Sequence, residues 1–205
     1  LKTLDADTAN GLAEFKGQAL NLSGLTTLDA DTAKALANFK CQSLNLDGLT
    51  TLDADTANGL AEFKGQVLFL KGLTALDADT AKALANFKGQ RLDLHGLTTL
   101  DADTTQVLLA SKVWVWDGQL PRLTSLDAET AKALAEFKGQ VLFLNGLTAL
   151  DAETAKALAA YEKWNGQLPA LTAFETPDSV AIAQVLATRK GPLALPNLKK
   201  ISPKT

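Results

Sequence analysis

Apolar and polar positions alternate over short stretches of this chain and then change to a helical spacing. Leu20 and Leu22 alternate with small or polar residues over 19–23, which is the two-residue period of a strand. A glycine follows, and from 30 to 40 the apolar residues recur three and four positions apart, which is the period of a helix. This stretch therefore predicts a strand, a turn and a short helix.

The same pattern returns about every 24 residues. A leucine before the motif Asp-Ala-Asp/Glu-Thr marks each copy, and Phe174 takes its place in a divergent last one: the leucines are Leu4, Leu28, Leu52, Leu76, Leu100, Leu126 and Leu150. A strand and helix this short cannot bury a core alone, so repeats of this period stack on their neighbours. The pattern predicts an α/β repeat solenoid, with parallel strands on one side and helices on the other.

The array is expected to run through the whole chain. We predict one domain over 1–205 with about eight repeats, which are irregular around 113–125 and 161–173, and divergent in the last repeat over 174–201. Because the chain starts in the middle of a repeat and shows no capping repeat, we expect it to be a fragment of a longer protein.

Local signals place the ends of the helices. Asp29 is a natural N-cap, and Asp31 adds a negative charge to the first helical turn. Glycines farther along are expected to end the helices as C′ residues, the position after the C-cap. These glycines are Gly17, Gly65, Gly89 and Gly139.

Two repeats share a different motif, Trp-x-Gly-Gln-Leu-Pro. In each, a glycine (Gly118 or Gly166) falls where other repeats carry the first strand leucine, and a tryptophan stands two residues earlier. We expect each tryptophan to fill the space of the missing leucine, the alternative being an aromatic platform for a glycan or peptide. Pro121 and Pro169 should interrupt the strands locally, because proline cannot donate a ladder hydrogen bond.

The run LxLxGLTxL followed by an amphipathic stretch resembles bacterial leucine-rich repeats, most closely those of the Treponema/BspA-like type. The segment LALPNLKKI over 193–201 is close to that pattern. The resemblance implies a right-handed coil with a concave parallel sheet, convex short helices, and binding of a protein, peptide or glycan on the concave face. The asparagine usual after the strand is replaced by Leu25 and its equivalents, so repeated threonines are our candidates for bonding the turn backbones.

Composition and charge remove several classes of function. The chain has 20 basic and 23 acidic residues, a net charge of −3, one cysteine and one histidine. It therefore has no basic footprint for nucleic acid, no internal disulfide and no cysteine or histidine metal cluster. No apolar run is long enough to span a membrane, so membrane insertion is not expected. The sequence assigns no compartment.

Comparison within the chain locates its variable positions. Residues 4–51 and 52–99 agree at 40 of 48 positions. Six of the eight differences flank the strand leucines, where alternation points side chains away from the core and onto the concave face. The helices scarcely differ. Either this face was selected for different contacts, or its exposed positions tolerate any residue. The six positions in the second block are Val67, Phe69, Lys71, Arg91, Asp93 and His95.

These residues and their equivalents form the predicted binding face. Val67 and Phe69 form one apolar spot, and Val141 and Phe143 form another about three strands away, with charged residues between them. Two apolar anchors beside a charged strip suit an extended peptide or a partner loop. The tentative ligand-binding set is Val67, Phe69, Lys71, Arg91, Asp93, His95, Trp114, Val141, Phe143 and Asn145.

Catalytic chemistry is not indicated. His95 near Asp93 could suggest acid–base catalysis or a metal, but no nucleophile or second histidine accompanies it. We therefore predict no catalytic residue, no metal and no cofactor. Cys41 is expected to be incidental, although a thiol exposed at this position would be reactive enough to dimerise the protein. The favoured function is a non-enzymatic recognition module for an unknown protein or peptide. The alternative is a spacer or stalk in a larger bacterial protein.

Overall fold

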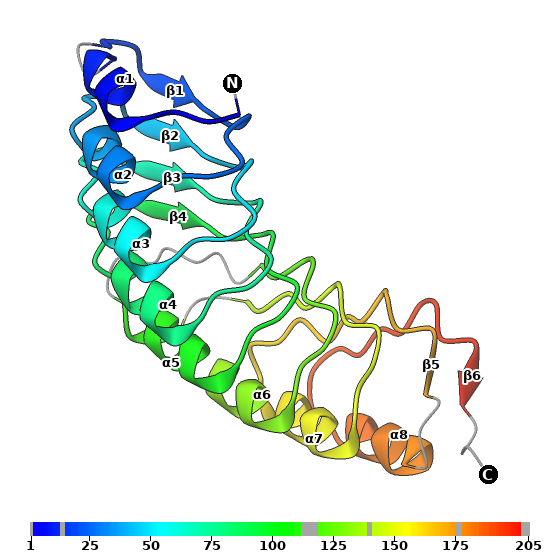
Figure 1. Ribbon diagram of the computed structural model, residues 1–205. Helices are drawn as coiled ribbons and strands as arrows, with labels where there is room; N and C mark the ends of the chain where they lie inside the picture. The colour runs from blue at the N-terminus through cyan, green and yellow to red at the C-terminus, as the bar shows by residue number, and fades with distance from the viewer. Residues whose placement is uncertain (1, 13–14, 112–118, 139–140, 175–177, 202–205) are drawn as a thin grey trace. The chain divides into compact units, whose positions relative to one another are not determined.

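The computed structural model describes residues 2–12, 15–111, 119–138, 141–174 and 178–201 (Figure 1). The chain divides into two compact units. Unit 1 comprises Leu1–Leu97 and Val107–Trp116, and unit 2 comprises Thr98–Gln106 and Asp117–Thr205. Trp114, Trp116, Gly118 and Gly139 lie outside the described residues.

Unit 1 contains a four-stranded parallel sheet whose strands follow chain order: β1 (Ala19–Asn21), β2 (Ser43–Asn45), β3 (Val67–Phe69) and β4 (Arg91–Asp93). The register advances by one repeat per strand, so that Leu20, Leu44, Leu68 and Leu92 lie opposite one another. A helix precedes each strand, and these helices pack side by side: α1 (Ala6–Gly11), α2 (Ala30–Ala37), α3 (Ala54–Ala61) and α4 (Ala78–Leu84).

Unit 2 keeps the alternation with less regular strands. Helices α6 (Ala128–Leu134), α7 (Ala152–Ala160) and α8 (Ser179–Ala187) pack in order, and β5 (Ala173–Phe174) pairs in parallel with β6 (Lys200–Ile201). The remaining pairing is reduced to parallel bridges, at Gln119–Phe143, Leu142–Trp164 and Gln167–Ala194. Helix α5 (Ala102–Ala110) lies between the regular and irregular repeats in the chain. The predicted α/β class with parallel strands is confirmed.

Seven repeats start their helix in the same way, whereas Asp178 before α8 makes no side-chain cap hydrogen bond. An aspartate accepts a hydrogen bond from the threonine N–H three residues later, at 2.7 Å, in all seven repeats that carry the motif. The aspartates are Asp5, Asp29, Asp53, Asp77, Asp101, Asp127 and Asp151. The predicted cap at Asp29 is therefore confirmed, and its threonine hydroxyl reaches back to the carbonyl of Leu4 in the previous repeat, at 3.5 Å.

The helices end earlier than the sequence predicts, and not at glycine. Helix α2 ends at Ala37 and α3 at Ala61, with Asn38 and Glu62 as ordinary right-handed C-caps. Among the described glycines only Gly166 has a positive φ, so the C′ assignment of Gly17, Gly65 and Gly89 was wrong. Gly65 instead allows close packing, because a Cβ there would overlap the Phe63 ring and lie 2.6 Å from the carbonyl oxygen of Cys41.

A column of aromatic rings follows the helices. Phe39, Phe63 and Phe87 are fully buried, and the rings of Phe63 and Phe87 stack with centroids 6.4 Å apart. Phe137 continues the pattern in unit 2, where Tyr161 donates a hydrogen bond from its hydroxyl to the Phe137 carbonyl, at 2.9 Å. Burial raises the pKa of Tyr161 to about 12. With the strand leucines, these rings make up the core.

Cys41 lies in this core. Its side chain is only 2% exposed, so the thiol lacks the exposure on which dimerisation through it would depend. Burial raises the pKa of the Cys41 thiol, which disfavours the thiolate. Cys41 stands two residues after Phe39, at the position where the equivalent repeats carry Gly17, Gly65 and Gly89.

Trp164 fills the strand position of the repeat that lacks the first leucine. It stands opposite Leu142 and is 1% exposed, while Gly166 absorbs the extra length with a φ of +72°. Arg189 lies with its guanidinium carbon 4.8 Å from the centre of the tryptophan ring and donates to the carbonyls of Trp164 and Tyr161. The structural interpretation of this tryptophan is confirmed. Trp116 lies outside the described residues.

Threonines also bond the turns, as anticipated. The hydroxyls of Thr26, Thr124 and Thr148 donate to the carbonyls of Lys2, Thr98 and Thr124, at 3.4, 3.4 and 3.2 Å. Each bond joins a turn to the equivalent turn of the previous repeat, so the threonines tie neighbouring repeats together.

At several of the equivalent turns, a glycine two residues before the threonine allows the repeats to approach. A Cβ at Gly72 would overlap the backbone oxygens of Asp47 and Leu49, whereas a Cβ at Gly11 would meet nothing within 4 Å. We predict that Gly72→Ala lowers the free energy of unfolding by about 1–3 kcal/mol through overpacking. Gly11→Ala should leave it within about 1 kcal/mol, or raise it. Denaturant titration of both variants checks this, and equal effects would contradict the account.

The caps predict acid sensitivity. Hydrogen bonds from Thr32 and Thr80 hold the pKa of Asp29 and Asp77 below its usual value. Because the folded pKa is depressed, this contribution to stability is present above pH ~4 and is lost as pH falls through the folded pKa. Asp29→Asn with Asp77→Asn keeps a capping oxygen but removes the titration. The melting temperature of this double variant should fall less than the parent's below pH 4.

The matched control for the caps is Asp31→Asn, which removes a carboxylate from the same helical turn without touching the cap. If it protects against acid as well as the cap variant does, loss of general charge rather than loss of caps causes the acid sensitivity.

Candidate functional site

The candidate site lies on the face of the unit 1 sheet opposite the buried leucines. The register of the strands arranges the outward residues in three columns that cross all four strands. The first column holds Ala19, Ser43, Val67 and Arg91. The second holds Asn21, Asn45, Phe69 and Asp93. The third, two residues after the second, holds Ser23, Asp47, Lys71 and His95.

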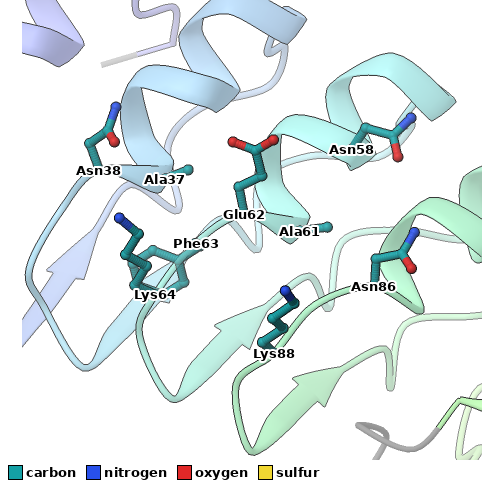
Figure 2. Close-up of a pocket in the computed structure, with 9 residues that line it drawn as sticks. All are labelled: Ala37, Asn38, Asn58, Ala61, Glu62, Phe63, Lys64, Asn86 and Lys88. Atoms are coloured by element: carbon teal, nitrogen blue, oxygen red, sulfur yellow. The ribbon is translucent and has the colours of Figure 1, made fainter.

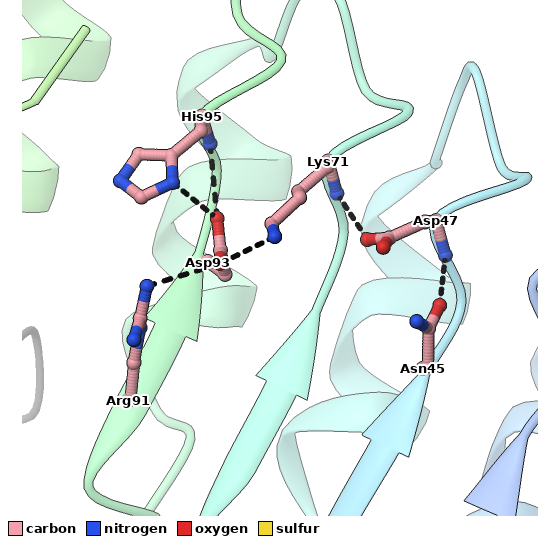
Figure 3. Close-up of polar contacts among 6 residues, drawn as sticks. All are labelled: Asn45, Asp47, Lys71, Arg91, Asp93 and His95. Atoms are coloured by element: carbon pink, nitrogen blue, oxygen red, sulfur yellow. Dashed lines mark hydrogen bonds and ion pairs between the residues drawn. The ribbon is translucent and has the colours of Figure 1, made fainter.

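The second column closes the turns at the strand ends. The side-chain oxygens of Asn21 and Asn45 accept hydrogen bonds from the backbone N–H two residues later, at 2.9 Å. Asp93 does the same for His95, at 3.3 Å. Phe69 has no such oxygen, and in its repeat the carboxylate of Asp47 on the neighbouring strand accepts from the Lys71 N–H instead, at 2.8 Å (Figure 3).

Sequence reasoning missed this role of the asparagines. It took the asparagine usual after the strand as absent because Leu25 and its equivalents stand there. The signal lay four residues earlier, in the recurrence of Asn or Asp at 21, 45 and 93. Short polar side chains that bond their own backbone two residues on are favoured at such turns.

Asp93 is the centre of the site. Its side chain is 0% exposed, and three basic side chains surround it (Figure 3). Its Oδ1 lies 2.9 Å from Nδ1 of His95. Its Oδ2 lies 3.2 Å from Nη2 of Arg91 and 3.5 Å from Nζ of Lys71. Burying a carboxylate is costly unless it is paired and hydrogen-bonded, and these groups supply both oxygens with partners.

The basic groups around Asp93 remain accessible. The side chains of Lys71 and Arg91 are 47% and 45% exposed, and that of His95 is 23% exposed. The Lys71 ammonium also lies 5.4 Å from the centre of the Phe69 ring, within the range of a cation–π contact. The arrangement therefore places two half-exposed cations on Asp93, one of which lies directly beside a half-buried aromatic ring.

Five of the six predicted unit 1 residues are joined by direct contacts. Phe69, Lys71, Arg91, Asp93 and His95 form one connected group, which we call the Asp93 cluster. Val67 stands beside it, opposite Arg91 in the register, and is half-buried. The sequence placed these residues on one face, but it predicted a strip of surface charges and not a buried carboxylate with basic residues around it.

The unit 2 residues of the predicted set form a second, smaller group. Val141 and Phe143 are half-buried and flank the buried Leu142, as expected for outward strand positions. Asn145 stands two residues after Phe143, and within the described residues its side-chain oxygen is buried without a hydrogen-bond partner. This group belongs to unit 2, whereas the Asp93 cluster belongs to unit 1. Trp114 lies outside the described residues.

A groove on the helix side of unit 1 is the other candidate. It encloses about 900 Å³ between the ends of α2, α3 and α4, where Ala37 and Ala61 leave space (Figure 2). Lys64 and Lys88 lie along it together with Glu62. Most of its lining recurs at equivalent positions of neighbouring repeats, and lysines near helix C-termini are favoured by the helix dipole. Helix packing and dipole electrostatics account for this groove.

Comparison with known proteins finds no matching family model and no matching curated protein. Within the described residues, no group of three or more His, Cys, Asp or Glu side chains is placed to hold a metal ion. In the same part of the chain, no helix is long and apolar enough to cross a membrane. The Asp93 cluster therefore has to be interpreted from its own geometry.

The cluster makes a prediction about stability. Replacing Lys71 and Arg91 by serine, the residue at equivalent positions of the first block, leaves Asp93 buried with only His95 beside it. The free energy of unfolding should fall by about 1–2 kcal/mol, because a buried charged group loses partners. Adding Asp93→Asn, the residue present at Asn45, should restore most of the loss. Denaturant titration measures both variants, and additive losses would contradict this interpretation of the cluster.

Proposed function

We propose that the chain is a recognition module, a right-handed array similar to bacterial leucine-rich repeats, that binds a protein or peptide segment on the outward face of its sheet. The Asp93 cluster is the binding centre, and Phe69 with Val67 provides the apolar anchor. The in-register parallel strands, and the return of the same caps and turns every repeat, support the solenoid. The sequence motif supports the leucine-rich-repeat type.

The single observation that carries this proposal is how the internal differences assemble. Two nearly identical 48-residue blocks differ at eight positions, and five of the second-block residues contact one another in one cluster, with a sixth beside it. Independent drift at tolerant surface positions gives no reason for a carboxylate and its three basic partners to appear together. Selection for a shared contact surface does.

The shape of the site favours a chain-like partner. The three columns run across four strands without a wall, so an extended segment can lie over them, whereas a small metabolite is usually held in an enclosed pocket. Arginine and aromatic side chains are frequent at the centres of protein interfaces. We propose Phe143 and Val141 in unit 2 as a separate apolar contact of the same kind.

The test begins with a display library of random 12-residue peptides, selected on the parent chain. The matched variant returns all six positions to their first-block residues: Val67→Ala, Phe69→Asn, Lys71→Ser, Arg91→Ser, Asp93→Asn and His95→Asp. Each residue is one that the same fold already carries, so the variant should fold. We predict that selected peptides bind the parent at least tenfold more tightly than they bind this six-position variant. Calorimetry or fluorescence anisotropy measures both affinities.

Single variants and a control refine the result. Phe69→Asn alone should weaken binding about fivefold or more, because a central aromatic anchor is lost. Ala75→Thr reverts a block difference outside the cluster and should bind as the parent does. If no peptide distinguishes the parent from the six-position variant, the recognition proposal fails and the spacer function becomes the better account.

A further inference from the structure

The spare hydrogen-bond donors of the Asp93 cluster indicate what it would bind. An arginine carries five N–H donors and a lysine three. Asp93 contacts Arg91 through Nη2 and Lys71 through Nζ, each at one carboxylate oxygen. Both side chains are nearly half exposed, so their remaining donors face solvent on the outward side of the sheet. Both oxygens of Asp93 already have partners, so the remaining N–H donors are not needed to pair the buried carboxylate.

Asp93 holds these cations in place. Long basic side chains lose rotamer freedom when they bind, and a side chain that is already fixed loses less. The buried carboxylate draws Arg91 and Lys71 to the same oxygen from neighbouring strands, while His95 occupies the other. Asp93 is therefore a positioning residue, whose effect on a ligand would act through Arg91 and Lys71.

The charges facing the cluster define where a ligand fits. The two cations and Asp93 together carry a formal charge of +1, and His95 adds to it when protonated. Asp47, two residues after the end of β2, directs its carboxylate to the backbone N–H of Lys71. An incoming anion is repelled on the Asp47 side and attracted on the Arg91 side. The apolar neighbours of this position are Phe69 and Val67.

We propose that the Asp93 cluster binds the carboxylate of an Asp or Glu side chain in an extended peptide segment, between Arg91 and Lys71, with an apolar side chain of the same segment on Phe69. This inference deepens, and rests on, the proposed peptide-binding function. An internal acidic residue suits the site because the columns of the face continue past the cluster over β2 and β1, and leave room for the chain on that side.

The experiment uses the peptides selected on the parent chain. Each binding peptide is synthesised with its acidic residues and again with each acid replaced by its amide, Glu to Gln or Asp to Asn, with the C-terminus amidated in both. The unchanged peptide is also synthesised with a free C-terminus. We predict that one acid-to-amide change weakens binding to the parent about tenfold. The same change should weaken binding to Arg91→Ser less than threefold, because the partner of the carboxylate is already gone.

Two further variants separate positioning from long-range charge. Asp93→Asn raises the net charge by one, so simple attraction predicts tighter binding of the acidic peptide. Positioning predicts weaker binding and a smaller ratio of acid to amide affinity. Asp47→Asn keeps an acceptor for the Lys71 N–H and removes the opposing charge, so it should tighten binding of the acidic peptide about twofold.

The outcomes separate this inference from the proposed function. If peptides distinguish the parent from the six-position variant but tolerate the acid-to-amide change, the face binds peptides and the carboxylate inference is overturned. Loss of binding on amidation of the C-terminus alone would assign the site to a terminal carboxylate, and would also overturn it. If no peptide distinguishes the two chains, both proposals fail. Tighter binding by Asp93→Asn would overturn the positioning role.

Discussion

Close contact between the backbones of successive repeats is the constraint on which the rest of unit 1 depends. The backbone N–H groups of Gln42, Gln66 and Gln90 each donate to the glutamine carbonyl 24 residues earlier, at 2.6–2.8 Å. Gly48, Gly72 and Gly96 allow successive turns to approach as closely, since a Cβ at each would overlap backbone carbonyls of the previous repeat. This backbone ladder fixes the register of the strands. A one-residue slip would turn every outward side chain toward the core, so the ladder also keeps the three columns on the outward face.

This register turns differences between repeats into neighbours in space. Lys71 and Asp93 are 22 residues apart in sequence, but Lys71 stands just past the end of β3 and Asp93 ends the neighbouring strand β4, so the two side chains form an ion pair. A regular array can therefore gain a site through a few outward substitutions, while the leucines, phenylalanines and caps stay unchanged. The Asp93 cluster is such a site, since the helices and the strand leucines of the second block have the same sequence as those of the first.

Much of this arrangement follows from the sequence. The strand positions, the aspartate caps and the outward direction of the six variable residues all depend on local period and on residues with strong positional preferences. The ends of the helices were not predictable, because glycine can serve either a left-handed turn or close packing, and Gly65 serves the second. The burial of Cys41 is likewise decided by its neighbours from other repeats.

The chemistry of the site was only half predictable. Alternation places Asp93 outward, and an outward aspartate is expected to be exposed. It is buried because Arg91, Lys71 and His95 converge on it from two strands, which depends on side-chain conformations and not on spacing. The asparagine role at the turns was missed for a related reason. Asn21 and Asn45 act on backbone two residues away, a contact that strand periodicity does not report.

The most direct test of the account is to move the site. The first block offers the same strands and register, so Ala19→Val, Asn21→Phe, Ser23→Lys, Ser43→Arg, Asn45→Asp and Asp47→His are introduced together into the six-position variant. Calorimetric titration with a peptide selected on the parent chain then measures binding to the moved site. The account predicts that the affinity lost in the six-position variant is recovered. An affinity that stays at the level of the six-position variant, in a chain that unfolds with the parent's cooperativity, would contradict it.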